Sequence, residues 1–302
     1  MVSPDSLESR LRAKLASGEI SAEEFEELFE RFKELGLLES DERKLNSLIV
    51  TGRKSYDEDL VVEGPVTVAG ILRISGDLEC QRLGIAGSGN ITGEVRVNGR
   101  CAINGKLDVG KDIKVKGECT ITGKCFASNA MYCIDRLTVA GKLIAPEKLV
   151  VGNRLKILGK VTVGSVECAS SILVQGSLKS AGNVIAEKLV SPRGGNSSIG
   201  GNLIAKEVQV GRVQKSSDEL GEIVGRLLTS LIGLKTETMF HIKGSIKAKK
   251  IQANNIRING DIVADVIQLG DNVEVRGNIY YTQSIEASQH LKEKAERIVA
   301  EE

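Results

Sequence analysis

Pairs of apolar residues recur along this chain at intervals of six. When residues 94–165 are written as twelve units of six, the second and fourth positions of every unit are apolar, 24 positions in all. The position between them is mostly polar, as at Arg96, Lys114 and Thr138. Because side chains alternate between the two faces of a strand, each unit predicts a short β-strand with two buried side chains.

A corner residue precedes each unit. It is Gly, Asn or Asp in ten of the twelve units, for example Gly105, Gly123 and Gly141. These residue types tolerate left-handed backbone at little cost. We therefore predict a sharp corner with left-handed backbone between successive strands.

Short strands of this kind bury their apolar pairs only if each one packs on a copy of itself in the next coil of the chain. Three units make one coil of about 18 residues, so Leu107, Cys125, Leu143 and Val161 should stack in one column. Crossovers between parallel strands are overwhelmingly right-handed. The predicted fold is all-β with helical additions, a right-handed parallel β-helix of triangular section.

Interruptions of the six-residue period divide the chain. A helical pattern occupies the N-terminal segment, interrupts the strands once and returns at the end of the chain. The predicted divisions are a helical hairpin at 1–45, a linker at 46–58, the main β-helix block at 59–211, a helical insertion at 212–239, a second β-helix block at 240–283 and a C-terminal helix at 284–302.

The apolar faces of the hairpin and the insertion are candidate docking surfaces. Ser21 and Glu24 form a capping box before the second helix of the hairpin. Each face either packs on the chain itself or contacts another chain, and both readings stay open here. The candidate docking residues are Phe25, Leu28, Phe29 and Phe32 in the hairpin, and Leu220, Ile223, Val224, Leu227, Leu228 and Leu231 in the insertion.

Two resemblances accompany these patterns. Residues 15–25, Leu-Ala-Ser-Gly-Glu-Ile-Ser-Ala-Glu-Glu-Phe, resemble the short helical module called SHOCT, which implies oligomerisation or docking. The units at 93–99, 117–123 and 256–262 resemble the bactofilins, the polymer-forming cytoskeletal proteins. That resemblance implies filaments that assemble end to end without nucleotide. The helical head, the insertion and the terminal helix depart from the bactofilin pattern.

The ends of a β-helix expose unpaired strand edges, which are templates for another chain. We therefore place the candidate assembly surfaces at the first and last coils of the predicted solenoid. The candidate residues are Leu60, Val62, Val66 and Val68 at one end, and Val273, Val275, Ile279 and Tyr281 at the other.

Composition excludes several other classes of function. A net charge of +1 and an aromatic content of 3%, with no Trp, argue against nucleic-acid binding. No run of 18 apolar residues exists, and the first residues lack the basic and apolar regions of a signal peptide, so we expect a cytoplasmic protein. Lys243, Lys247, Lys249 and Lys250 form either a solvated face or a contact with anionic lipid, so a membrane surface is a further candidate partner.

Candidate chemistry is sparse. The six cysteines contain no CxxC spacing and all fall on inward positions, so we expect no metal site and no cofactor. A hexapeptide-type acyltransferase needs a catalytic His between protomers, and neither His241 nor His290 is well placed. The leading hypothesis is a self-assembling structural protein that is not an enzyme. The alternative is a non-polymerising adaptor with capped ends that docks another protein through its helices, and the acyltransferase is a remote third.

Overall fold

A computed structural model describes residue 21 and residues 45–192, 196–211, 239–270 and 272–299. By its contacts the chain separates into two units, Met1–Lys44 and Leu45–Glu302, and the solenoid belongs to the second. The predicted helical hairpin at 1–45, apart from Ser21 and Leu45, and the predicted helical insertion at 212–239, apart from its last residue, lie outside the described residues.

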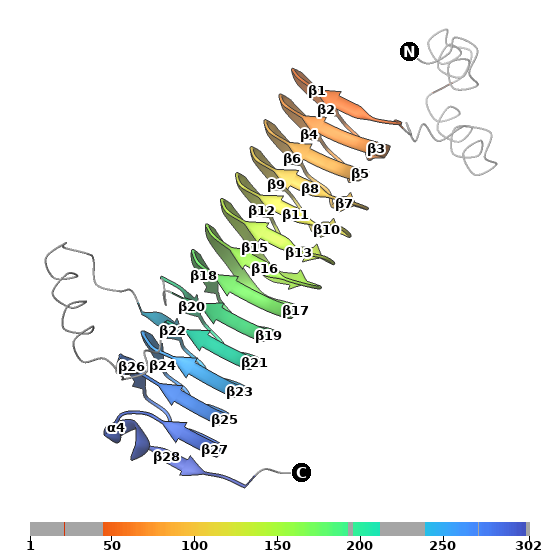
Figure 1. Ribbon diagram of the computed structural model, residues 1–302. Helices are drawn as coiled ribbons and strands as arrows, with labels where there is room; N and C mark the ends of the chain where they lie inside the picture. The colour runs from red at the N-terminus through yellow and green to blue at the C-terminus, as the bar shows by residue number, and fades with distance from the viewer. Residues whose placement is uncertain (1–20, 22–44, 193–195, 212–238, 271, 300–302) are drawn as a thin grey trace, which may run out of the picture. The chain divides into compact units, whose positions relative to one another are not determined.

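The described residues form one parallel sheet of 28 strands, which winds through about 12 turns (Figure 1). The first strands are β1 (Leu48–Val50), β2 (Arg53–Tyr56), β3 (Leu60–Val68), β4 (Ile71–Ile74), β5 (Leu78–Ile85), β6 (Ser88–Ile91), β7 (Val95–Val97), β8 (Cys101–Ile103), β9 (Lys106–Val109) and β10 (Ile113–Val115). The next are β11 (Cys119–Ile121), β12 (Lys124–Ala127), β13 (Ala130–Cys133), β14 (Leu137–Val139), β15 (Lys142–Val151), β16 (Leu155–Ile157), β17 (Lys160–Val174), β18 (Ser177–Ser180) and β19 (Val184–Ser191). The last are β20 (Ser198–Ile199), β21 (Leu203–Val210), β22 (Phe240–Ile242), β23 (Ile246–Ala253), β24 (Ile256–Ile258), β25 (Ile262–Leu269), β26 (Val273–Val275), β27 (Ile279–Glu286), α4 (Gln289–Lys292) and β28 (Ala295–Arg297).

Three faces run along the solenoid, and each is a ladder of parallel strands. Face A contains the starts of β3 and β5, then β7, β10 and β13, and continues through β15, β17, β19, β21, β23, β25 and β27 to β28. Face B contains β1, β8, β11, β14, β16 and the later parts of β3, β5, β17, β19, β21, β23, β25 and β27. Face C contains β2, β4, β6, β9, β12, the starts of β15 and β17, and then β18, β20, β22, β24 and β26.

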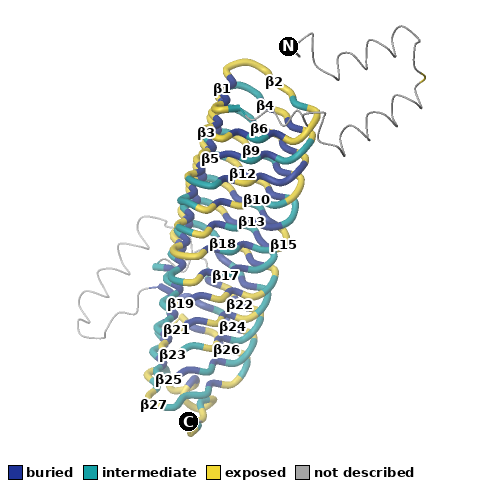
Figure 2. The backbone as a smooth tube through the Cα atoms, turned by 90° about the vertical axis from the view of Figure 1, so that its right-hand side faces the viewer, coloured by how far each residue is buried: buried dark blue, intermediate teal, exposed yellow. Residues whose placement is uncertain are grey.

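The predicted stacking is confirmed. Leu107 pairs with Cys125, Cys125 with Leu143, and Leu143 with Val161, so a turn takes about 18 residues. Leu107, Leu143 and Val161 are fully buried. Burial of one such aliphatic side chain stabilises the fold by about 1.5–3 kcal/mol. In Figure 2 the buried positions alternate with exposed and intermediate ones along the strands. The pairings define parallel winding, and its right-handed sense stays a prediction.

The corner residues differ from the prediction in their backbone. Among the described residues only Asn255 and Gly211 have positive φ, at 55° and 71°. The glycines are needed for another reason, because successive turns touch at the corners. A Cβ on Gly123 would lie 1.9 Å from the carbonyl oxygen of Gly105, and one on Gly141 would lie 1.9 Å from that of Gly123.

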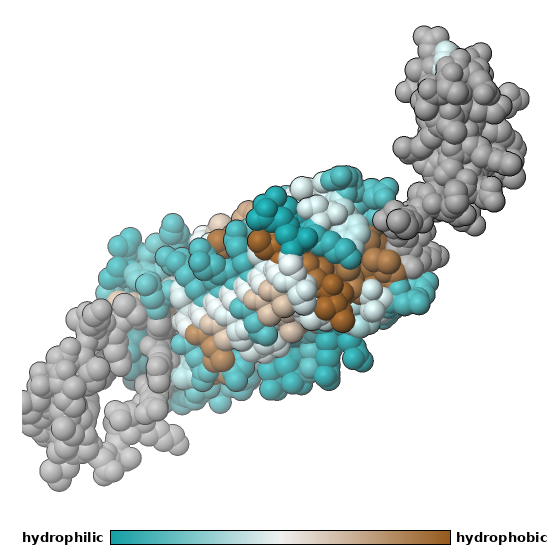
Figure 3. All heavy atoms as spheres, turned by 90° about the horizontal axis from the view of Figure 1, so that it is seen from above, coloured by the Kyte–Doolittle hydropathy of each residue, from teal (hydrophilic) through white to brown (hydrophobic). Residues whose placement is uncertain are grey.

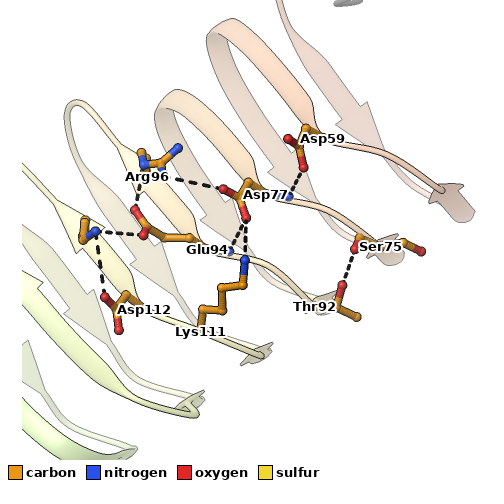
Figure 4. Close-up of polar contacts among 9 residues, drawn as sticks. Asp59, Ser75, Asp77, Thr92, Glu94, Arg96, Lys111 and Asp112 are labelled. Atoms are coloured by element: carbon orange, nitrogen blue, oxygen red, sulfur yellow. Dashed lines mark hydrogen bonds and ion pairs between the residues drawn. The ribbon is translucent and has the colours of Figure 1, made fainter.

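A polar column occupies the corner that leads into face A (Figure 4). The Asp59 carboxylate accepts a hydrogen bond from the backbone N–H of Asp77 at 2.7 Å, and Asp77 accepts one from that of Glu94 at 2.8 Å. Asp112 does the same for Ala130 at 3.2 Å. A backbone N–H left without an acceptor at a buried corner costs free energy. These side chains therefore join each turn to the next.

Different faces carry different outward side chains. On face B the outward residues of successive turns are small and uncharged from β3 to β14, namely Thr67, Gly84, Ala102, Thr120 and Thr138. Figure 3 shows one side of the solenoid, on which pale and brown surface runs between teal margins. Charged residues on face A pair with each other, as in the contacts of Glu94 with Arg96 Nε at 2.7 Å and with Lys114 Nζ at 2.8 Å.

Two predicted divisions are wrong. The linker at 46–58 instead forms β1 and β2, which extend the solenoid by a turn. The C-terminal helix at 284–302 is reduced to the four-residue α4, because residues 284–286 continue β27 and Ala295–Arg297 forms β28. Strand pairing with the preceding turn satisfies more backbone groups there than an isolated helix would.

The six cysteines are free and buried, as their inward positions predicted. Cys101 and Cys119 pair in register on neighbouring strands. Burial raises the pKa of the Cys80 thiol to about 12 and that of Cys133 to about 12. A hydrogen bond with Cys101, together with burial, raises the pKa of Cys119 well above its ordinary value. These thiols are packing residues with low nucleophilicity.

Substitution of Gly123 by Ala should destabilise the solenoid by about 1–3 kcal/mol, because the new methyl group meets a backbone carbonyl that cannot move alone. Gly84→Ala is the matched control, since its Cβ would come no closer than 3.9 Å to the carbonyl oxygen of Val66. Urea denaturation followed by circular dichroism measures both. Equal stability of the two variants would contradict this explanation of the corner glycines.

The buried thiols predict a loss of stability at alkaline pH. Their folded-state pKa lies above the value of about 8.5 for an exposed thiol, so their contribution is complete below that pH and falls as the pH rises toward 12. At pH 10 each thiol should lower the free energy of unfolding by about 2 kcal/mol relative to neutral pH.

The double variant Cys80→Val/Cys133→Val tests this effect. Val62 and Val97 flank Cys80 in its column, so Val fits the column. The unfolding free energy of the variant should fall less between pH 8 and pH 10 than that of the wild type. Parallel declines in the two proteins would show that the thiols do not cause the alkaline loss.

Candidate functional site

The two ends of the solenoid are the candidate site, because they interrupt the strand ladders. At the N-terminal end β1 pairs with β3 and β2 pairs with β4, and no other described strand lies against either of them. Leu45 forms a single bridge to Val62 on face A. The outer edges of β1 and β2 are therefore unpaired within the described part of the chain.

The edge at β1 is short, but its residues do not oppose pairing with another strand. Its sequence is Leu48-Ile49-Val50, with no charge, proline or bulge. Leu48 and Val50 point inward, whereas the Ile49 side chain is 71% exposed. An exposed apolar edge strand is a ready template for pairing with another chain. The neighbouring β2 is different, because it exposes Arg53 and Lys54, and Lys54 Nζ lies 5.7 Å from the Tyr56 ring centre.

The C-terminal end is closed over face C by α4. This helix follows β27 where the next strand of face C would begin. Its Leu291 is buried in the core. Lys294 Nζ donates a hydrogen bond to the carbonyl oxygen of Val275 at 3.2 Å, which occupies an acceptor on the edge of β26. The last face C strand is thus covered.

Over face A the same end is closed by β28. Ala295 pairs with Ile279, and Arg297 with Tyr281. The side chains of Glu296 and Arg297 are exposed. Charged residues on a short edge strand oppose further pairing. The two ends therefore differ: one presents an apolar edge and the other presents a helix and a charged strand.

The eight residues predicted as end surfaces are buried or partly buried, because further chain covers them at both ends. Leu60, Val62, Val66 and Val68 are buried, and β1 covers the last two. Val273, Val275 and Ile279 are buried, and Tyr281 is partly buried beneath β28. The elements exposed at the ends are instead β1 and β2 at one end and α4 and β28 at the other, so the candidate assembly surfaces move to them.

A signal for β1 is present in the sequence. Leu48 and Val50 have the same spacing as the other inward pairs, and they pair with Val66 and Val68. The predicted docking residues of the hairpin, Phe25, Leu28, Phe29 and Phe32, lie outside the described residues. So do those of the insertion, namely Leu220, Ile223, Val224, Leu227, Leu228 and Leu231.

The described ranges lack the features of a metal site and of a membrane-spanning helix. These residues contain no group of three or more His, Cys, Asp or Glu side chains placed to hold a metal ion. No helix among them is long and apolar enough to cross a bilayer. Comparison of the chain with models of protein families, with curated proteins and with solved structures finds no match in any of the three.

The C-terminal cap predicts a local effect of Leu291→Ala. Loss of the one buried side chain of α4 should weaken the cap by about 2–5 kcal/mol. Amide hydrogen exchange should then become faster in Val273–Val275, while Leu137–Val139 in the middle of the solenoid keeps its rate. Lys292→Ala in the same helix is the control. Unchanged exchange in β26 would show that α4 does not protect this strand.

Proposed function

We propose that this chain is a structural scaffold that self-associates through the N-terminal end of its solenoid. The observation that carries the proposal is the edge of β1, which is unpaired in the described structure, free of charge and exposes Ile49. A strand added there would satisfy the open backbone groups and cover the exposed apolar side chain. The buried core beneath it makes the end a rigid platform.

The closed C-terminal end favours a discrete oligomer. Two N-terminal ends that meet through β1 would form a two-fold contact, in which the same surface serves both copies and growth stops. A filament needs a second contact at the other end. This solenoid is compatible with the bactofilin-like polymer that the sequence resembles, so filament growth is the second candidate function, although the charged Glu296 and Arg297 of β28 oppose the contact that it would need at the C-terminal end.

Ile49→Arg tests the main proposal. The charge should oppose strand pairing at β1 and weaken self-association by at least about tenfold, since burial of a charge without a partner is costly. Sedimentation velocity of the wild type should show a species larger than the 32.4 kDa monomer, and the variant should sediment as the monomer.

Two controls locate the contact. Ile134 is 65% exposed in the middle of the solenoid, so Ile134→Arg adds the same charge away from the ends and should leave assembly intact. Val299, at 91% exposure, reports on the C-terminal end. If Val299→Arg abolishes filaments seen by electron microscopy and leaves small oligomers, both ends take part. A monomeric wild type would overturn the proposal and leave the adaptor hypothesis.

A further inference from the structure

Face C carries a column of exposed lysines. Lys106, Lys124, Lys142 and Lys160 begin four successive strands and pair in register. Neighbouring strands lie about 4.8 Å apart, so the four ammonium groups project from one straight line on the same side of the sheet. Like charges directly opposite each other on adjacent strands destabilise a sheet.

Only one lysine of this column has an acidic partner among the described residues. Lys106 contacts Asp108, and among the described residues the other three lysines form no ion pair. Some lysines elsewhere on the solenoid do have acidic partners: Lys148 Nζ lies 2.8 Å from Glu167, and Lys206 Nζ lies 2.6 Å from Glu187. The mutual repulsion of these lysines is therefore not offset by ion pairs, and the column does not help to stabilise the fold.

Apolar side chains lie beside the lysines. Phe126 and Ile144 come two positions after Lys124 and Lys142, so they point outward from the same face. Phe126 is 36% exposed, and Leu158, in the corner just before Lys160, is 41% exposed. Positive and apolar groups thus share one side of a regular sheet.

We propose that this lysine face binds the surface of a bilayer that contains anionic lipids. Each lysine would be attracted to anionic headgroups, while the apolar side chains enter the boundary between headgroups and acyl chains. Lysine stems also pack on apolar surface with the ammonium group in water. A soluble polyanion would contact the lysines and leave the apolar side chains in water, so the lipid surface accounts for more of the face.

The other lysine-rich segment does not form such a face. Lys247 lies on face A between Ile204 and Val263, whereas Lys243 follows β22 on face C. Lys250 lies opposite Glu207. These lysines therefore point in different directions, and Lys247 and Lys249 supply a control with the same number of charges.

Flotation of the full-length protein with vesicles tests the proposal. The wild type should float with vesicles of equal parts phosphatidylcholine and phosphatidylglycerol, and should not float with phosphatidylcholine alone. Lys124→Glu/Lys142→Glu should weaken binding by at least about tenfold. Lys247→Glu/Lys249→Glu should keep wild-type binding. Equal losses in both variants, or equal binding to both kinds of vesicle, would overturn the proposal.

The apolar contribution separates a lipid surface from a soluble polyanion. Phe126→Ser should weaken vesicle binding, and inorganic polyphosphate should bind less well than the vesicles at the same charge concentration. If Phe126→Ser has no effect and polyphosphate displaces the protein, the face is a polyanion site and the lipid proposal fails. Circular dichroism checks folding, and Lys124→Gln/Lys142→Gln replaces the charge reversal if that variant unfolds. Because face C is separate from β1, this result is independent of the Ile49 variants.

Discussion

In-register pairing of parallel strands between successive turns is the constraint on which the rest of the solenoid depends. A slip of one residue would turn every inward side chain outward, because side chains alternate along a strand. The pairing tolerates insertions and irregularities in the segments that connect the strands. Leu203 pairs with Ile246 across the interrupting segment 212–238, and the register shifts between Ala145 and Lys148 without loss of either ladder. Only the strands need to align.

The corners meet two separate physical requirements. Where turns come into contact, as at Gly123, the residue must lack a Cβ because the carbonyl of the preceding turn is too close. Where the chain enters face A, the residue must supply an acceptor, as Asp77 does for the next turn. Both requirements favour small or short polar residues. The Gly, Asn and Asp residues at the corners are therefore explained by contact between successive turns, and left-handed backbone is not required.

Outward side chains are not constrained by packing in the core, so the three faces can carry different kinds of residue. Face B is small and uncharged over several turns, and face A carries paired charges. Face C carries a lysine column with apolar neighbours, in which only Lys106 has an acidic partner among the described residues. The ends differ as well, because β1 leaves an apolar edge and α4 closes the other end. A rigid repeat with distinct surfaces suits a protein that holds other components in place.

By itself the sequence determined most of the strands, their inward residues and the size of the turn, because apolar pairs with a six-residue period are buried when each strand stacks on the strand one turn away. Leu107, Cys125 and Leu143 were predicted to stack, and they do. Only the tertiary structure decided where the stack ends. Leu48 and Val50 are a single short pair, and residues 289–297 fit a helix or a strand by local pattern. The secondary structure of these segments depends on the turn against which they pack, and that contact joins residues far apart in the chain.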